Sequence, residues 1–163
     1  MRTEGNIKRY CTFNVDERLY GVDILDVNEV NVITEFTPIF HAPATVKGYM
    51  NIRGQIYLVL DLRVLLGFEP SEKCENIVIF KSSVGEPFGV LVDRVSDVLE
   101  IKASNIENRR QKNTATIEEG DRRLEGGDFV EGVCSLEREI LLILDAKKLL
   151  TPFSIIESQY EMN

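Results

Sequence analysis

The sequence predicts a mainly β protein that contains two small β-barrels of about five strands each, with only short helices. Three observations lead to this prediction. Short apolar segments alternate with glycine turns at close intervals, long amphipathic helical patterns are scarce, and one block of sequence occurs twice. Short strands separated by regularly spaced turn residues are typical of small barrels. The chain has 163 residues, which suits one large domain or two small ones.

The block that occurs twice begins at Val46 and combines a glycine turn, an apolar run and a short helical segment. The apolar run, Ile56 to Leu60, is uninterrupted, and such a run between turn residues indicates a strand buried on both faces. Asp61 follows directly and is a good helix N-cap, because its carboxylate can accept hydrogen bonds from the first free amides of a helix. Gly67 stands where a glycine commonly ends a helix.

Two constant offsets relate the copies. Residues 46–66 align with residues 130–150 at an offset of 84, and residues 20–22 align with residues 88–90 at an offset of 68. The second copy is therefore longer by 16 residues. These residues belong to a segment rich in charge, Asn and Thr, Lys102 to Asp128, which we expect to be mostly loop.

We expect a single domain over residues 1–163, with approximate pseudo-repeats at residues 19–67 and 87–150. The polar segment Glu69 to Glu75 is the predicted seam between them. After the second copy, Thr151-Pro152 supplies an N-cap and a proline at the first helical position, so a terminal helix is predicted at Phe153 to Glu161.

The other strands are predicted where apolar and polar residues alternate or where short apolar runs lie between turns. They fall at residues 9–15, 19–24, 77–80 and 88–92. Val27, Val30 and Ile33 are three residues apart, which suits either a bulged, strongly twisted strand or a single helical turn. The spacing belongs to the repeated unit, because it recurs at Val95, Val98 and Ile101.

The composition makes several classes of function unfavourable. The net charge is −8, from 27 acidic against 19 basic residues, and this sign repels nucleic-acid phosphates. The one basic cluster, Arg109 to Lys112, is expected to be a solvated loop tip. We therefore expect no binding to nucleic acid.

The sequence also predicts a cytoplasmic protein. No apolar run approaches the roughly 20 residues that cross a bilayer, and the N-terminal residues lack the apolar stretch of a signal peptide. The three cysteines are odd in number and widely spaced, which favours neither a disulfide framework nor a zinc site.

The chain offers few residues for catalysis. His41 is the only histidine, and its loop context favours a structural or surface role. Asp61 and Asp145 occupy equivalent positions of the two copies, where they are either paired carboxylates or two helix caps, and the caps need only local geometry. We expect no enzymatic activity, no catalytic residue, no metal site and no cofactor.

The two copies differ in one pair of charges. The first copy has Glu29 and Arg53, whereas the second has Asp97 and Glu137 at the equivalent positions. A requirement of the fold itself should appear in both copies, so the first pair is a candidate functional feature. Our hypothesis is that Glu29 and Arg53 meet beside the groove between the barrels and orient a partner. The alternative is two independent surface charges.

Several motifs occur in a fixed order along nearly the whole chain. They are Tyr20-Gly21-Val22-Asp23-Ile24, Val27, Glu29-Val30, Pro43, Val46-Lys47-Gly48, Asn51-Ile52-Arg53-Gly54, Val59 to Arg63, Phe88-Gly89-Val90, Val92-Asp93, Val95 to Val98 and Ile140 to Leu150. This ordered set resembles the CheW family of chemotaxis coupling proteins. Its length makes the resemblance specific.

The resemblance implies two intertwined SH3-like barrels, with strands exchanged between two barrel subdomains. It also implies a non-catalytic adaptor or scaffold role in signal transduction. Such proteins link the cytoplasmic tip of methyl-accepting chemoreceptors to the regulatory domain of the chemotaxis histidine kinase. Contact with the membrane is therefore expected only through the receptors.

The resemblance further implies binding residues. The receptor-facing groove would include Val27, Glu29, Val30, Gly48, Arg53, Val95 and Val98, and Ile77 falls in a region associated with binding to the kinase. From the residues alone, most of these valines are expected in the core. The resemblance instead needs them exposed between the barrels, as an apolar groove for a helical hairpin. We accordingly expect Val27→Asp and Arg53→Glu to abolish coupling while leaving the fold intact.

Two other functions are open from the sequence. One is an adaptor of a chemosensory pathway other than flagellar motility. The other is a ligand sensor or enzyme that uses the cleft between the barrels. A deep enclosed pocket with strongly shifted carboxylates favours the latter, and a shallow apolar groove favours the adaptor.

Overall fold

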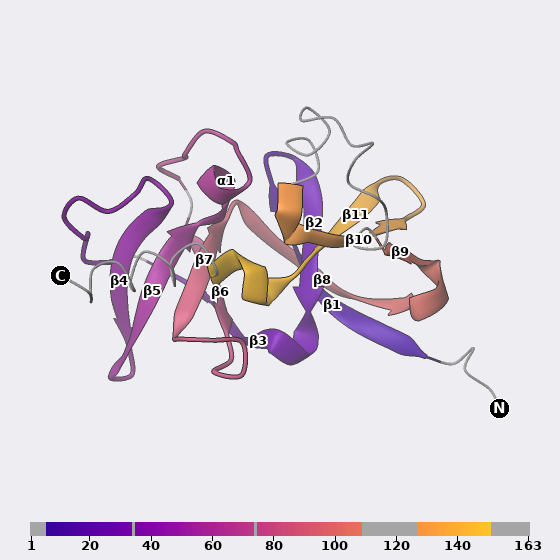
Figure 1. Cartoon of the computed structure of the whole chain (residues 1–163), viewed down its shortest axis with the longest axis horizontal. Coiled ribbons are helices and arrows are strands. Elements are labelled where there is room, and N and C mark those ends of the chain that lie inside the picture. Colours follow the sequence, from indigo (N-terminus) through magenta and orange to yellow (C-terminus); the bar gives the residue numbers. More distant parts are fainter. Residues whose placement is uncertain (1–5, 34, 74, 109–126, 151–163) are drawn as a thin grey trace.

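The computed structural model of the protein describes residues 6–33, 35–73, 75–108 and 127–150. It is mainly β, as the sequence predicts, with few short helices (Figure 1). The strands are β1 (Ile7–Val15), β2 (Arg18–Asp23), β3 (Val27–Val32), β4 (Val46–Ile52), β5 (Gln55–Asp61), β6 (Asn76–Phe80), β7 (Phe88–Val92), β8 (Arg94–Lys102), β9 (Ile106–Asn108), β10 (Val130–Ser135) and β11 (Ile140–Leu144). The helices include α1 (Leu62–Leu65) and the 3-10 helix η2 (Ile24–Asp26).

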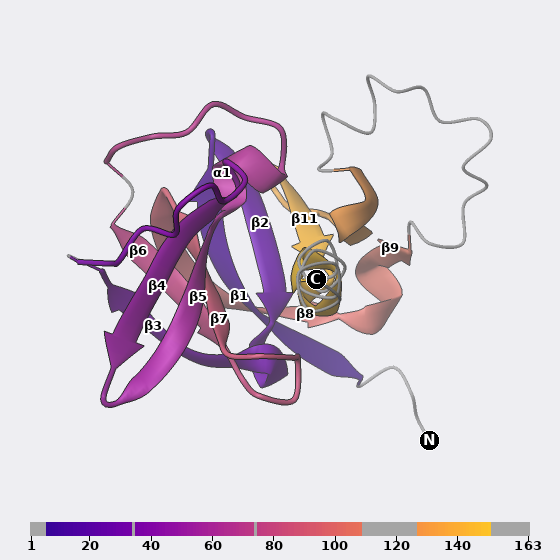
Figure 2. The same ribbon diagram turned by 60° about the vertical axis from the view of Figure 1, so that its left-hand side comes forward.

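The strands form two sheets. The six-stranded sheet has the order β8-β1-β2-β11-β10-β9, and the five-stranded sheet has the order β3-β6-β7-β5-β4. Figure 2 shows β4, β5, β6 and β7 curving around one side of the molecule, with β1, β2 and β11 beside them. The sixth strand of the larger sheet is β9, which pairs with β10. It lies in the segment Lys102 to Asp128, which was expected to be mostly loop, and is a strand of three residues within it. Residues 109–126 of that segment lie outside the described residues.

The two sheets repeat one pairing pattern. In the six-stranded sheet β11 runs parallel to β2, with Leu142 opposite Tyr20. In the five-stranded sheet β5 runs parallel to β7, with Leu58 opposite Phe88. The two pairs occupy equivalent positions of the two copies, because Tyr20 and Phe88 are related by the offset of 68 and Leu58 and Leu142 by the offset of 84. Each parallel pair joins an early strand to a late one, so both sheets contain strands from both halves of the chain.

The valines that are spaced three apart lie on bulged strands. In the β3–β6 pair, Val27 faces Phe80 and the register then shifts. In the β1–β8 pair, the register shifts between the rows of Val95 and Val98. The sequence left a bulged strand or a helical turn open, and the structure shows the bulge at both places. A bulge places two residues opposite one and redirects the side chains that follow.

One large core cluster takes side chains from both sheets. It includes Phe13 and Tyr20 from the six-stranded sheet and the stacked rings of Phe80 and Phe88 from the five-stranded sheet. Two smaller clusters are built around one sheet each, and Ile77 belongs to that of the five-stranded sheet. We call the large cluster the central cluster.

The strand β5 is less buried than the sequence predicts. Its last apolar residues, Val59 and Leu60, are fully buried, but Ile56 at its start is 49% exposed. The equivalent residue of the other copy, Ile140, is also exposed. Both residues lie at the turn end of a hairpin, before the rows in which β5 pairs with β7 and β11 pairs with β2. The prediction of burial on both faces was therefore wrong for the first part of the run.

The predicted helix caps are present in both copies. The Asp61 carboxylate accepts a hydrogen bond from the amide of Arg63 at 3.0 Å, and the Asp145 carboxylate accepts one from the amide of Lys147 at 3.1 Å. Gly67 has a φ of +93° where the first helix ends. These aspartates therefore cap helices and are not a catalytic pair.

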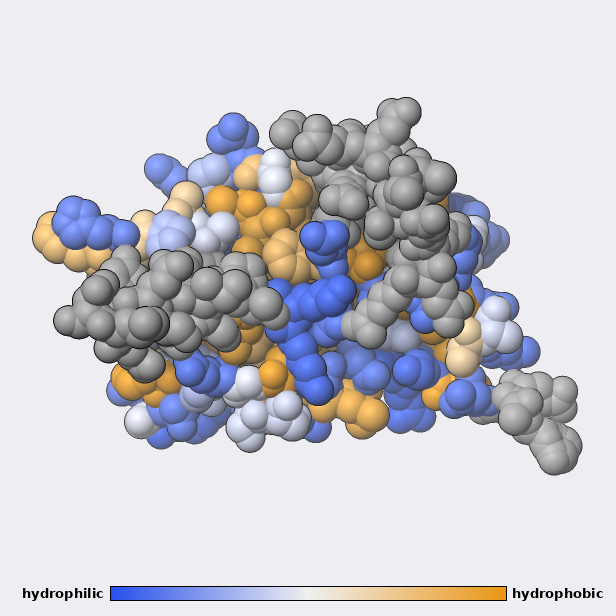
Figure 3. All heavy atoms as spheres, viewed as in Figure 1, coloured by the Kyte–Doolittle hydropathy of each residue, from blue (hydrophilic) through white to orange (hydrophobic). Residues whose placement is uncertain are grey.

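The surface has both apolar and hydrophilic regions. Figure 3 shows apolar residues reaching the surface around α1 and a hydrophilic band over the segment that follows β11. Within the described parts of the chain, no helix is long and apolar enough to cross a bilayer. The basic cluster at residues 109–112 and the terminal helix at 153–161 lie outside the described residues.

Candidate functional site

The Glu29 and Arg53 side chains meet, as the sequence predicts. The Arg53 guanidinium donates a hydrogen bond to the Glu29 carboxylate, and Asn31 donates a second one to the other carboxylate oxygen at 3.3 Å. Glu29 lies on β3 and Arg53 in the turn between β4 and β5. Since β3 and β4 are the two edge strands of the five-stranded sheet, the ion pair bridges the edges of that one sheet.

The local sequence presents Arg53 to solvent. Arg53 and Gly54 form the two-residue turn of the β4–β5 hairpin, with φ values of +51° and +87°. Positive φ at both central residues is the geometry that matches the twist of a hairpin. The Asn51 side chain accepts a hydrogen bond from the Gly54 amide at 2.9 Å and stabilises the turn. As a result, the Arg53 side chain is 70% exposed although its partner Glu29 is only 24% exposed.

The bulges divide the four valines into two inward and two outward residues. Val27 is buried in the central cluster and Val95 packs against it. Val30 and Val98 are 40% and 53% exposed. Val30 and Val98 therefore lie at the surface, whereas Val27 and Val95 pack against the central cluster beneath their strands.

Gly48 and Ile77 are not surface contacts. A side chain at Gly48 would place its Cβ 2.2 Å from the carbonyl oxygen of Thr37, so the close approach of residues 37–38 explains the glycine. The Ile77 side chain is fully buried in the core of the five-stranded sheet. Neither residue presents a side chain that a partner could reach in this structure.

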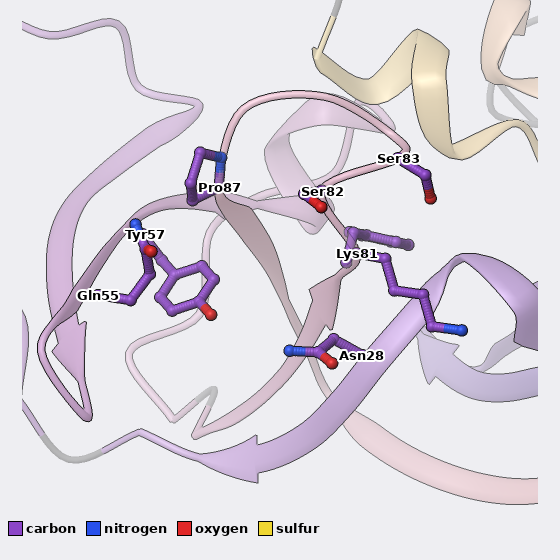
Figure 4. A pocket seen from close by; sticks show the side chains of 8 residues that line it. Asn28, Gln55, Tyr57, Lys81, Ser82, Ser83 and Pro87 are labelled. Atoms are coloured by element: carbon purple, nitrogen blue, oxygen red, sulfur yellow. The ribbon is translucent and has the colours of Figure 1, made fainter.

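A hollow lies among β3, β5 and the loop between β6 and β7. It has a volume of roughly 470 Å³ and is lined by Asn28, Gln55, Tyr57, Phe80, Lys81, Ser82, Ser83 and Pro87. Figure 4 shows Asn28, Tyr57 and Ser82 around it, contributed by β3, β5 and the loop between β6 and β7. Asn28 is adjacent to Glu29, and Gln55 is two residues from Arg53.

The hollow has a mixed apolar and polar lining that carries almost no charge. Its lining contains one cation and neither a carboxylate nor a histidine nor a cysteine. Such groups can form hydrogen bonds to a partner's surface but supply no carboxylate or imidazole for proton transfer. These residues were not predicted from the sequence. They come from three distant segments, and no local pattern links them.

The chain is similar to known proteins over most of its length. The family model of the CheW-like domain matches residues 9–152. The chain belongs to this family. A chemotaxis protein CheW of Klebsiella aerogenes is 30% identical over 145 residues, which cover 88% of this chain and 82% of the relative. A second, from Rhizobium meliloti, is 31% identical over 139 residues, which cover 85% of this chain and 84% of the relative.

A solved CheW structure has the same fold. The crystal structure of the scaffolding protein TtCheW from Thermoanaerobacter tengcongensis superimposes with a TM-score of 0.69 at 30% identity, covering 85% of this chain and 88% of that one. The CheW-like family is a non-catalytic scaffold of chemotaxis signalling, and the chain is a member of it. Among the described residues, no group of three His, Cys, Asp or Glu side chains is placed to hold a metal ion.

Proposed function

We propose that this CheW-like chain couples the cytoplasmic tip of methyl-accepting chemoreceptors to the regulatory domain of the chemotaxis histidine kinase. It works in the cytoplasm and reaches the membrane only through the receptors. Membership of a chemotaxis scaffold family supports this function. The exposed Glu29–Arg53 pair, which the other sheet lacks, is the observation in this chain that carries it.

The receptor-facing surface comprises Val30, Val98 and the Glu29–Arg53 pair. The two valines supply exposed apolar area on two edge strands, and the pair supplies orientation at one end. Apolar side chains of a helical hairpin would pack on the valines, as amphipathic helices do in apolar grooves. Val27, Val95 and Gly48 contribute by holding β3, β8 and β4 in place.

A kinase contact is proposed in the region of β6, and since residues 77–80 of this strand are all buried, neighbouring segments would form the contact surface. Ile77 itself is fully buried, so it would act by fixing this strand and not by touching the kinase. Such contacts suit the weak, reversible association of a signalling adaptor, whose interfaces lie at the small end of the usual range.

Calorimetry with soluble fragments tests this function. The wild-type protein is titrated with a receptor signalling tip and, separately, with the kinase regulatory domain. We expect Arg53→Glu to lower receptor affinity at least tenfold, because it places two like charges at the docking surface. Its thermal midpoint should stay close to that of the wild type, since exposed substitutions change stability little.

The control is Arg138→Glu, which reverses the charge of another exposed arginine in a hairpin turn, that between β10 and β11. It should bind both fragments as the wild type does. Absence of wild-type binding to either fragment at high micromolar concentration would contradict the proposed function. Unchanged receptor affinity in Arg53→Glu would contradict the proposed surface.

A further inference from the structure

We propose that Arg63 is a positioning residue for the docking surface. Its guanidinium fixes the point at which the chain passes from the five-stranded sheet to the six-stranded sheet, and thereby holds the exposed Val98 in place. This inference rests on the proposed function, because it assigns Arg63 a part in receptor docking.

The Arg63 side chain binds three acceptors from different parts of the chain. It donates to the Asp93 carboxylate at 2.7 Å, to the Asp16 carboxylate at 3.2 Å and to the Glu69 carbonyl oxygen at 2.6 Å. Arg63 lies on α1, Asp16 in the turn between β1 and β2, and Asp93 between β7 and β8. A planar guanidinium can hold several acceptors in one fixed geometry.

Asp93 is the single residue between β7 of the five-stranded sheet and β8 of the six-stranded sheet. Its amide donates to the Asn14 carbonyl oxygen at 3.0 Å, and its carbonyl oxygen accepts from the Asn76 side chain at 3.4 Å. Its carboxylate also accepts from the Asp16 amide at 2.8 Å. The point at which the chain passes between the sheets is therefore bonded to residues of both sheets, and Arg63 is the charged partner of Asp93.

The same contacts set the start of β8. The Asn14 side chain accepts hydrogen bonds from Arg94 at 3.2 Å and from Ser96 at 2.9 Å. The bulge that turns Val98 outward follows directly. A change at the crossing is therefore transmitted to Val98 through a strand segment of only a few residues.

The Arg63 side chain is well shielded, with 14% of it exposed. Burial alone would lower the pKa of its guanidinium, but the Asp93 and Asp16 carboxylates raise that pKa above its ordinary value. A shielded, fully charged contact of this kind is stronger than a solvent-exposed ion pair.

The second crossing between the sheets is built differently. It runs through η2, where Leu25 occupies the position equivalent to Asp93 and is 71% exposed. Lys147 occupies the position equivalent to Arg63. A lysine is a point charge without a planar fork, so residue 147 lacks the guanidinium geometry with which Arg63 holds its acceptors.

The test compares Arg63→Gln with Arg63→Lys in receptor titrations, at a temperature where circular dichroism shows each variant folded. We expect Arg63→Gln to bind the receptor tip about tenfold more weakly and Arg63→Lys to recover part of the loss. The matched control is Arg138→Gln, which removes an exposed arginine in the turn between β10 and β11, away from β8 in the six-stranded sheet, and should bind as the wild type does.

A double-mutant cycle separates positioning from general destabilisation. In the Arg63→Gln background, Val98→Ala should cost much less affinity than in the wild type, because Val98 is already misplaced. Arg53→Glu should cost the same in both backgrounds, because it lies on the other sheet. Full additivity of Arg63→Gln with Val98→Ala would overturn the inference, as would wild-type affinity in folded Arg63→Gln.

Methyl NMR of the free protein gives a readout that does not depend on the receptor. Arg63→Gln should shift the signals of Val95 and Val98 and leave that of Val30 unchanged. These shifts combined with no receptor binding by the wild type would contradict the proposed function while supporting the positioning of β8. Unchanged signals of Val95 and Val98 would overturn the inference.

Discussion

Val27 and Val30 lie three residues apart on β3, yet the bulge between them buries the first and exposes the second. The equivalent pair on β8 is divided similarly, because Val95 is half-buried against the central cluster and Val98 is exposed. Residue type alone therefore does not decide which valine can meet a partner. The orientation depends on the strand across the bulge.

Two matched substitutions test this difference. Val27→Asp places a carboxylate in the central cluster and should lower the free energy of unfolding by about 3 kcal/mol or more. Val98→Asp places one in solvent and should change it by less than about 0.5 kcal/mol, while weakening receptor binding. Urea denaturation of both variants makes the comparison. Because Val27 is buried, the expectation from the sequence that Val27→Asp leaves the fold intact is replaced by this expected loss of stability. Equal stability of the two variants would contradict the burial of Val27.

The raised pKa of Tyr10 predicts that the protein loses stability at alkaline pH. Burial, and then the charges of Asp23, Glu131 and Cys134, raise the pKa of its hydroxyl to about 12. The folded state therefore keeps this proton where the unfolded chain, with a pKa near 10, releases it. The stabilising contribution is complete below pH 10 and is lost as the pH rises from about 10 to 12.

Tyr10→Phe should remove this contribution to the pH dependence. Urea denaturation between pH 9 and 12 should show a shallower loss of unfolding free energy in the variant than in the wild type. Identical slopes for the two proteins would contradict the assignment to Tyr10.

Several residue-level features could be predicted from the sequence because they are local. The caps at Asp61 and Asp145 need only the next few amides, and the repeat pointed to the Glu29–Arg53 pair through the charges that the second copy lacks. From the residues alone, most of the candidate valines were expected in the core, and this is right for Val27. The exposure of Val30 and Val98 could not be predicted in the same way. It depends on which face of each strand meets the other sheet.

At the scale of elements, β4 illustrates how a single glycine admits a neighbouring segment. Gly48 has a φ of +148°, and residues 37–38 pass directly over it. The amide and carbonyl groups of Thr37 and Tyr49 exchange hydrogen bonds at 2.7 and 2.8 Å beside it. This short contact covers the outer edge of β4, much as β9 covers the outer edge of β10 in the other sheet.

Gly48→Ala should displace residues 37–38, because the new Cβ would overlap the Thr37 carbonyl group. We expect the free energy of unfolding to fall by about 2–4 kcal/mol. Gly54→Ala is the control, since Gly54 also has a positive φ but has open space around it, and should cost only about 1 kcal/mol. Urea denaturation distinguishes the two, and equal losses would show that backbone conformation, and not the close approach, explains Gly48.

Most strands could be predicted from alternation and from short apolar runs, but β9 could not. It consists of three residues in a charged segment, and only its pairing with β10 makes it a strand. The exposure of Ile56 was missed for a related reason. An apolar run indicates burial, but the end of a hairpin extends past the strands that would cover it.

At the scale of the whole molecule, the central cluster makes the two sheets interdependent. Phe13 and Phe88 are both fully buried in it although they belong to different sheets. Neither sheet can bury these side chains alone. The repeat in the sequence predicts two similar units, but which strands pair across them follows from packing that no single segment encodes.

We therefore expect the described fold to unfold in one cooperative transition. Phe13→Ala should lower the free energy of unfolding by about 3–5 kcal/mol and keep a single transition. Hydrogen exchange should show slow amides in β1 and in β7 losing protection together. Loss of protection in the six-stranded sheet alone would contradict the shared core.

The parallel pairing of β2 with β11 also has a consequence for protein synthesis. Tyr20 lies opposite Leu142, so a strand made early must wait for one of the last strands described here. A nascent chain that has emerged only through β10 still has an open edge on β2 and part of the central cluster in water. During translation this protein should therefore depend on chaperones, or on rapid completion of the chain, to avoid premature association.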